Sequence, residues 1–244
     1  MKRCSAEEAV KLIRPVDSLC LGFGPAQPCS LLESMSNRED WEDLTAFGGM
    51  ILEPYPIFTK PGVHLLSGFF GPAERALRNA GHDVAFLPGD FRRFKLFAER
   101  MHARIMAIAA TPPDADGFLS LSIAAGATVD EIHRCGSDPD RLLIVETTPF
   151  LPRTLGLLPD HSHRVHVDEV DIMIETQRVP MELAEAEPTH IERAIAALVQ
   201  AFVPDGATLQ TGIGGIPGAV AGLLADGPGG DYGIHSEMFT TGLM

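Results

Sequence analysis

One pattern occurs twice in this chain and limits what it can fold into. Near each end a capping box is predicted, in which a hydroxyl side chain and a glutamate satisfy backbone N–H groups at a helix start. The boxes are Ser5 with Glu8 and Thr189 with Glu192. Each precedes an apolar stripe at helical spacing, a helix breaker, a short apolar strand and a glycine turn. This order of signals predicts two units that alternate helices and strands, and therefore an α/β fold.

The glycine turns support an internal duplication. Gly22 and Gly24 follow the first strand, and Gly212 and Gly214 follow the second, at a constant offset of 190 residues. A helix is expected after each turn. Self-similarity at a fixed offset is typical of chains that contain related structural units, so we predict two related α/β domains.

Further strands are predicted from short apolar runs. Continuous apolar runs are typical of strands that are covered on both faces of a sheet. We therefore expect an open α/β sheet with flanking helices. The predicted strands are residues 17–21, 105–110, 142–145, 171–174 and 207–210.

The two domains are expected to differ in completeness. We place one full N-terminal domain in residues 1–180, and a linker with the beginning of a second, incomplete domain in residues 181–244. The segment 176–188, which contains two prolines and several glutamates, is the expected linker region. Half a domain leaves the apolar face of its sheet uncovered. The second domain is therefore expected to be cut short, or to be completed by another chain.

Charge and cysteine content exclude several classes of protein. The 19 Lys and Arg residues against 33 Asp and Glu residues give a net charge of −14. Nucleic acids and anionic membrane surfaces bind basic faces, so neither is expected as a partner. The four cysteines show no Cys-x-x-Cys spacing, so neither a metal site nor a disulfide framework is predicted. With no apolar run of membrane-spanning length, we expect a reduced, cytoplasmic globular protein.

The second glycine turn is the first candidate for a functional site. It continues from Gly214 through Gly215, Ile216, Pro217 and Gly218 into the next helix. Glycines let a backbone approach a ligand closely, and a helix start offers free N–H groups to phosphate. The turn is not a Walker loop, and Pro217 takes the place of the third glycine of a dinucleotide fingerprint. A phosphate-binding loop and a tight turn without a ligand both stay open.

A glutamate is the second candidate. Glu237 follows the strand-like segment 232–236, where open α/β sheets bind ligands. Its neighbours Met238 and Phe239 are expected to keep water away and so to raise the basicity or nucleophilicity of the carboxylate. The alternative is an ordinary surface glutamate.

Together the two candidates resemble a known family. Residues 210–217, with the sequence QTGIGGIP, and residues 233–238, with the sequence GIHSEM, are similar to the acetyl-CoA hydrolase/transferase family. This family includes 4-hydroxybutyrate and acetate CoA-transferases. Weaker similarities at 112–122, 145–154 and 166–171 extend the resemblance over nearly the whole chain. Members of the family are longer, and their C-terminal half carries a further glycine-rich segment.

The resemblance implies a two-domain CoA-transferase fold and a covalent mechanism. In the family a glutamate attacks an acyl-CoA thioester, and the resulting glutamyl-CoA thioester is resolved by a carboxylate acceptor. Glu237 matches that glutamate, and residues 214–218 match the loop that contacts coenzyme A. The implied substrates are a short-chain acyl-CoA and a carboxylate, with no metal. The implied partner is a second copy in a homo-oligomer such as a homodimer, or a chain that supplies the missing C-terminal half.

Three other functions stay open. Hydrolysis of acyl-CoA differs from transfer only in whether water reaches the glutamyl thioester. A catalytically incomplete fragment or subunit that binds coenzyme A is favoured by the missing half. A nucleotide-binding oxidoreductase would depend on the glycine turn alone.

Other polar residues are weaker candidates. Glu146, at the end of a predicted strand, either faces the same cleft or caps a loop. The alternating histidines in residues 161–166 are expected in a solvated loop rather than at a metal, because no cysteine lies near them. Arg92, Arg93 and Lys95 form the densest basic cluster, which either meets the phosphates of coenzyme A or occupies a solvated helix face.

Overall fold

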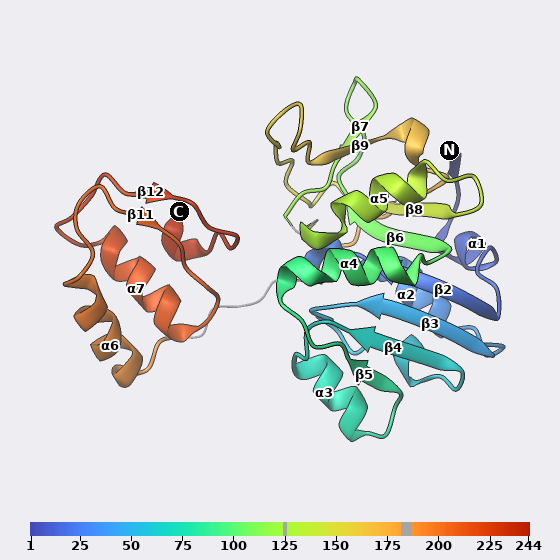
Figure 1. The fold of residues 1–244 in the computed structure, drawn as a ribbon, viewed down its shortest axis with the longest axis horizontal. Coiled ribbons are helices and arrows are strands. Elements are labelled where there is room, and N and C mark those ends of the chain that lie inside the picture. Colours follow the sequence, from blue (N-terminus) through green and yellow to red (C-terminus); the bar gives the residue numbers. More distant parts are fainter. Residues whose placement is uncertain (124–125, 182–186) are drawn as a thin grey trace. The chain divides into compact units, whose positions relative to one another are not determined.

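The computed structural model describes residues 1–123, 126–181 and 187–244. It divides into two compact units, unit 1 (Met1–Met181) and unit 2 (Glu182–Met244), each with its own sheet and helices (Figure 1). The central part of the predicted linker, residues 182–186, lies outside the described residues.

Unit 1 is built on an eight-stranded sheet in which all neighbouring strands are parallel. The strand order is β1-β10-β8-β6-β2-β3-β4-β5 (Figure 1). The open α/β sheet is thereby confirmed, and the four strands predicted in this unit are present as β2, β6, β8 and β10. The strands of the sheet are β1 (Lys2–Arg3), β2 (Val16–Leu21), β3 (Asp43–Gly48), β4 (Val63–Ser67), β5 (Val84–Phe86), β6 (Ile105–Ala110), β8 (Leu142–Thr147) and β10 (Ile172–Glu175).

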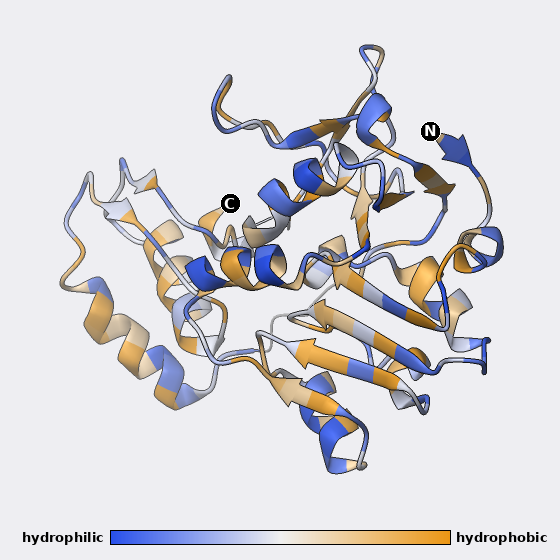
Figure 2. Cartoon of the chain, turned by 45° about the vertical axis from the view of Figure 1, so that its right-hand side comes forward, coloured by the Kyte–Doolittle hydropathy of each residue, from blue (hydrophilic) through white to orange (hydrophobic). Residues whose placement is uncertain are grey.

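Helices cover both faces of this sheet, as its apolar strands require. All six residues of β6 are buried, and five of them alternate between two apolar clusters, with Ile105 and Ala107 in one and Met106, Ile108 and Ala110 in the other. The first cluster includes residues of α1, α2 and α3, and the second includes residues of α4, α5 and the small antiparallel sheet β7–β9. Hydrophobic colouring follows the central strands (Figure 2). The covering elements are α1 (Ala6–Val10), α2 (Cys29–Ser36), α3 (Pro72–Asn79), α4 (Phe91–Met101), α5 (Val129–Gly136), β7 (Phe118–Ser120) and β9 (Arg164–His166).

The predicted linker begins too early. The N–H of Thr176 donates to the carbonyl of Thr147 at 2.9 Å, so the chain still follows the sheet at this point. The guanidinium of Arg178 binds both carboxylate oxygens of Glu53 at 3.0 Å. Residues 176–178 are therefore held by unit 1.

Unit 2 repeats the order of the first elements of unit 1. In each unit a helix, a strand, a second helix and a second strand follow one another, and both predicted capping boxes are present. The two strands are parallel neighbours in each case: Val16 pairs with Asp43, and Thr208 pairs with Gly233. The elements of unit 2 are α6 (His190–Gln200), β11 (Thr208–Leu209), α7 (Gly215–Ala225), β12 (Gly233–Ile234) and the 3₁₀ turn Thr241–Leu243.

Most large apolar side chains of α6 are exposed. Four of them and Phe202, which follows the helix, lie at helical spacing, with exposed fractions between 37% and 86%. Among the described residues of unit 2, the buried apolar residues are Ala196, Ala221, Leu224 and Leu243. Unit 2 therefore carries an uncovered apolar stripe. The stripe consists of Ile191, Ile195, Leu198, Val199 and Phe202.

Candidate functional site

The glycine turn between β11 and α7 has a backbone that only glycine adopts readily. Gly214, which precedes α7, has φ 133° and ψ 169°, a region closed to residues with a side chain. A methyl group added at Gly215 would collide with the carboxylate of Glu192. Methyl groups added at Gly212 or Gly218 would meet no atom within 4 Å. The backbone therefore requires glycine at 214, whereas a side chain at 215 would displace only the flexible end of Glu192, and the fold leaves space for one at 212 and 218.

The start of α7 supplies hydrogen-bond donors at this turn. The first residues of an α-helix have N–H groups without an acceptor inside the helix. In α7 these residues are Gly215, Ile216 and Pro217, and proline has no N–H to offer. The intrahelical pattern begins where the N–H of Gly218 donates to the carbonyl of Gly214 at 3.1 Å. Gly215 and Ile216 are therefore the donors that the turn presents to a ligand.

The segment that carries Glu237 lies beside this turn. The Ser236 hydroxyl donates to the carbonyl of Thr211 at 3.1 Å and accepts from the N–H of Thr211 at 3.3 Å. One residue earlier, the N–H of His235 donates to the carbonyl of Leu209 at 3.0 Å. The carboxyl ends of β11 and β12 thus bring together the two segments that the sequence analysis singled out.

The carboxylate of Glu237 itself is open to solvent. Its side chain is exposed and makes no hydrogen bond or ion pair with the part of the chain that the structure describes. Phe239 is 63% exposed. Met238 and Phe239 were predicted to keep water away from this carboxylate. Within unit 2 that prediction is wrong, because Phe239 is itself largely exposed and Glu237 stays open to solvent.

Unit 1 has its own topological switch point, between β2 and β6. From β2 the chain moves outward through β3, β4 and β5, and then returns to the other side of β2 to add β6, β8 and β10. Ligands of open α/β sheets bind beyond the carboxyl ends of the strands at such a point. Residues 22–28 follow β2 there, and residues 111–117 follow β6. By the internal repeat, the segment after β2 corresponds to the glycine turn after β11.

Glu146 caps a helix and does not face an open cleft. Its side chain is 2% exposed, and its two carboxylate oxygens accept from the N–H groups of Ser30 and Leu31 at 3.1 Å each. These residues form the first turn of α2, where N–H groups have no partner inside the helix. Burial raises the pKa of the Glu146 carboxyl, and the two N–H donors oppose that shift. Of the two interpretations of this residue, capping is the correct one.

The basic cluster on α4 is engaged in local ion pairs. Arg92 and Arg93 pair with Asp90, and Lys95 pairs with Asp130. These basic side chains are at least half exposed, so they occupy a solvated helix face.

The histidines are only in part in a loop. Residues 164–166 form β9, and His163 and His166 bind the backbone carbonyls of Ser122 and Asp116. Among the described residues, no group of three or more His, Cys, Asp or Glu side chains is arranged to hold a metal ion. None of the described helices has the length and apolarity needed to cross a membrane.

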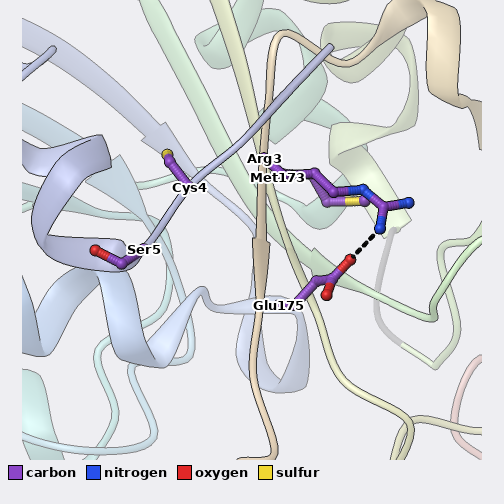
Figure 3. A pocket seen from close by; sticks show the side chains of 5 residues that line it. All are labelled: Arg3, Cys4, Ser5, Met173 and Glu175. Carbon is purple, nitrogen blue, oxygen red and sulfur yellow. Dashed lines mark ion pairs between the residues drawn. The ribbon is translucent and has the colours of Figure 1, made fainter.

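A hollow at the β1 edge of the large sheet has no comparable chemistry. It is lined by five residues, and its charged groups are Arg3 and Glu175, whose Nη1 and Oε1 atoms lie 2.9 Å apart (Figure 3). Both side chains are more than half exposed, so each charge is in contact with solvent and also has a partner of opposite sign. We assign no ligand to this hollow, which lies at the sheet edge rather than at the switch point.

Solved structures share the fold of this chain. The structure of RipA from Yersinia pestis matches 99% of this chain and 57% of its own, with a TM-score of 0.84 and 26% identity. A 4-hydroxybutyrate CoA-transferase from Porphyromonas gingivalis shares the fold over 99% of this chain and 55% of its own, with a TM-score of 0.69 and 24% identity. No protein-family model matches the chain.

The curated relatives of this chain are also CoA-transferases. The butyryl-CoA:acetate CoA-transferase of Anaerostipes caccae is 28% identical in an alignment of 248 positions that covers 96% of this chain and 53% of that protein. The 4-hydroxybutyrate coenzyme A transferase of Clostridium kluyveri is 28% identical in an alignment of 249 positions that covers 100% of this chain and 55% of that protein. The chain is therefore a relative of the CoA-transferases, and the resemblance found in the sequence is confirmed. It spans about half the length of the curated relatives it matches.

Proposed function

We propose that this chain takes part in the transfer of coenzyme A from a short-chain acyl-CoA to a carboxylate, with Glu237 as the nucleophile. In this proposal residues 214–218 bind coenzyme A. The observation that supports it most is the pair of hydrogen bonds between Ser236 and Thr211, which ties the glutamate to the glycine turn. The names of the relatives add support, since one is a butyryl-CoA:acetate CoA-transferase and another a 4-hydroxybutyrate coenzyme A transferase.

The first half of the reaction converts the glutamate into a thioester. A carboxylate oxygen of Glu237 attacks the carbonyl carbon of acyl-CoA, the C–S bond breaks, and its electron pair leaves with the CoA thiolate. The product is an acyl-glutamyl anhydride. The thiolate then attacks the glutamyl carbonyl carbon, and the C–O bond breaks to release the donor acid as a carboxylate. Covalent catalysis of this kind divides one difficult step into two easier ones.

The second half runs the same steps with the acceptor. The acceptor carboxylate attacks the glutamyl-CoA thioester and releases the thiolate, which leaves a second anhydride. The thiolate attacks the acyl carbonyl of the acceptor, and Glu237 departs as a carboxylate. In each step one anion attacks and another anion leaves. No net proton transfer, oxidation or reduction is therefore needed.

The helix start contributes charge stabilisation in this proposal. The N–H groups of Gly215 and Ile216 suit the phosphate oxygens of coenzyme A, because helix N-termini favour anions. At Gly218 the fold leaves free space, so the missing side chain is explained if coenzyme A passes over this residue. A residue with a side chain at this position would hold coenzyme A away from the backbone.

Two narrower alternatives are each favoured by an observation. Hydrolysis of acyl-CoA is favoured by the exposure of Glu237 within unit 2, because water reaches an intermediate formed there. An incomplete site is favoured by the share of the relatives that the chain covers and by the apolar stripe on α6. The proposal therefore includes a further polypeptide, either the remaining half of the protein or a second copy in a homodimer. It also assigns residues 1–180 and 181–244 to two CoA-transferase domains, in a cytoplasmic protein whose four cysteines stay reduced.

Trapping of the intermediate tests this proposal. Borohydride reduces a glutamyl-CoA thioester to an alcohol, so incubation with acetyl-CoA and borohydride is expected to lower the mass of the peptide that contains Glu237. Glu237→Gln is expected to abolish both this mass change and CoA exchange. Its fold is expected to be unchanged, because the Glu237 carboxylate makes no contact that the described structure depends on.

A second glutamate provides the matched control. Glu187→Gln alters another exposed carboxylate of unit 2 and is expected to leave trapping and exchange at the level of the unaltered chain. Exchange retained in Glu237→Gln, or a trapped mass on any other peptide, contradicts the assignment. Release of coenzyme A that does not depend on added acetate would instead favour hydrolysis.

A further inference from the structure

Glu192 connects the start of α6 with the glycine turn of unit 2, whose two helices, α6 and α7, pack against each other (Figure 1). One of its carboxylate oxygens, Oε2, accepts from the N–H and from the hydroxyl of Thr189, at 2.7 and 2.8 Å. The hydroxyl of Thr189 also accepts from the N–H of Glu192 at 3.2 Å. The bonds from Thr189 lower the pKa of the Glu192 carboxyl, so this group is ionised at neutral pH.

The same carboxylate lies against Gly215, the first residue of α7. The three atoms nearest to a methyl group added at Gly215 all belong to it, with Cδ 2.7 Å and Oε2 3.1 Å from the added carbon. At Gly214 an added methyl group would meet only Pro217, and at Gly212 it would meet no atom within 4 Å. Among the glycines of the turn, Gly215 is therefore the one at which Glu192 supports the backbone.

The turn is held at its two ends. Ser236 bonds to the backbone of Thr211 at the first end, and Glu192 packs against Gly215 at the last. Two of the three residues between these ends are glycines, which have more backbone freedom than any other residue. Without support at the second end, the free N–H groups of Gly215 and Ile216 would lose their fixed direction.

The other capping box of the chain shows that capping alone does not produce this contact. In α1, Glu8 makes the same reciprocal bonds at the helix start. At the two glycines of the turn that follows, Gly22 and Gly24, the atoms nearest to an added methyl group belong to other residues and not to Glu8. A capping glutamate therefore need not reach the glycine turn, and in unit 2 α6 is placed so that Glu192 does.

We propose that Glu192 is a positioning residue for coenzyme A: its carboxylate closes the side of the glycine turn that faces α6, and it holds the N–H groups of Gly215 and Ile216 in the direction in which they meet the ligand. This inference rests on the proposed function for the identity of the ligand. Groups that are fixed before binding lose less freedom when the ligand binds, which raises affinity. Because like charges repel, the carboxylate also keeps the phosphates of coenzyme A away from α6, and the fold leaves space for them at Gly212 and Gly218.

Removal of the carboxylate tests the proposal. Glu192→Ala is expected to weaken the binding of coenzyme A, measured by calorimetric titration, by about fivefold. Glu192→Gln keeps the length of the side chain and an acceptor oxygen, so its affinity should stay within about twofold of that of the unaltered chain. Glu8→Ala removes the same capping chemistry from α1 and is the matched control, with unchanged affinity. Unchanged or higher affinity in Glu192→Ala would overturn the proposal.

A variant of the glycine tests the contact itself. Gly215→Ala displaces the end of the Glu192 side chain, so it is expected to weaken binding by a similar factor. In Glu192→Ala the space for this methyl group is free, and the addition of Gly215→Ala should cause no further loss. Residues in contact give effects that do not add, so losses that add up in the double variant would contradict the proposal.

The motion of the turn provides a measurement without ligand. In ¹⁵N relaxation experiments, the order parameter of the Gly215 amide is expected to fall from about 0.85 to below about 0.6 in Glu192→Ala. It should not change in Glu8→Ala. A role confined to capping α6 would lower the order parameters at the start of α6 and leave that of Gly215 as it is.

The outcomes separate this proposal from the proposed function. If coenzyme A binds and neither Glu192→Ala nor Gly215→Ala changes its affinity, the role of Glu192 is refuted and the proposed function stands. If coenzyme A does not bind but the order parameter of Gly215 falls in Glu192→Ala, the assignment of coenzyme A to this turn fails and the support of the turn by Glu192 stands. If neither binding nor a change in the order parameter is seen, both are refuted.

Discussion

Replacement of single glycines in the turn before α7 separates its structural role from its proposed role in binding. At Gly214 the φ of 133° and ψ of 169° are accessible to glycine only, so Gly214→Ala is expected to destabilise unit 2 by about 1–3 kcal/mol. This increases the opened population of the unit by about 5- to 150-fold. Gly218 lies inside α7, and a methyl group there meets no atom within 4 Å. Gly218→Ala is therefore expected to stabilise the helix by about 0.4–1 kcal/mol.

The two variants should agree in binding although they differ in stability. Both are expected to weaken the binding of coenzyme A, Gly214→Ala because the turn is lost and Gly218→Ala because its methyl group occupies the approach to the backbone. Gly222→Ala is the matched control: it lies one turn further along α7, also with no atom within 4 Å of an added methyl group. It should stabilise α7 equally and leave binding unchanged.

Amide hydrogen exchange followed by mass spectrometry is the appropriate assay of stability, because it reports on α7 separately from the larger unit 1. Calorimetric titration with coenzyme A measures binding of the same samples. Unchanged protection of α7 in Gly214→Ala would refute the reasoning from backbone conformation. Unchanged affinity in Gly218→Ala, with α7 intact, would refute the assignment of this turn to coenzyme A.

Two further predictions concern charges buried in unit 1. Because burial raises the pKa of Glu146 above its unfolded value, the folded state holds the proton more tightly, and stability should fall as the pH rises from about 4 towards the folded pKa. Glu146→Gln should remove this slope, which urea unfolding at a series of pH values measures, and a slope of unchanged size would contradict the assignment. Arg141 pairs with Glu131, and both side chains are at most 4% exposed. Arg141→Ala leaves that carboxylate without its main partner and should lower the free energy of unfolding by about 3–5 kcal/mol, whereas loss below 1 kcal/mol would show that Arg134, at 3.1 Å, replaces it.

The strands that the sequence predicts are those whose burial leaves a simple pattern. Every residue of β6 is buried, so its sequence is an uninterrupted apolar run. In β4 the burial alternates and places a histidine, His64, between apolar residues, while β5 is buried only at Val84. These strands lie towards the edge of the sheet, where one face or both faces are partly open. A short sequence that mixes polar and apolar residues cannot be distinguished from a loop unless the neighbouring strands are known.

The candidate site was partly visible for a similar reason. The glycine turn has a spacing that repeats in the chain, so Gly214 and its neighbours stand out in the sequence alone. The pairing of Ser236 with Thr211 depends on the register of β11 and β12, which no local pattern encodes.

The exposure of Glu237 connects the proposed activity with the rest of the protein. A glutamyl thioester that forms on an exposed carboxylate is open to water, and water then competes with the acceptor carboxylate for the same carbonyl carbon. Exclusion of water from a closed site is what suppresses such side reactions in enzymes. Unit 2 keeps both its glutamate and the apolar stripe of α6 uncovered. In the proposed function, transfer rather than hydrolysis therefore requires that protein atoms from outside unit 2 cover this glutamate. The choice between the two reactions then depends on that cover rather than on the nucleophile.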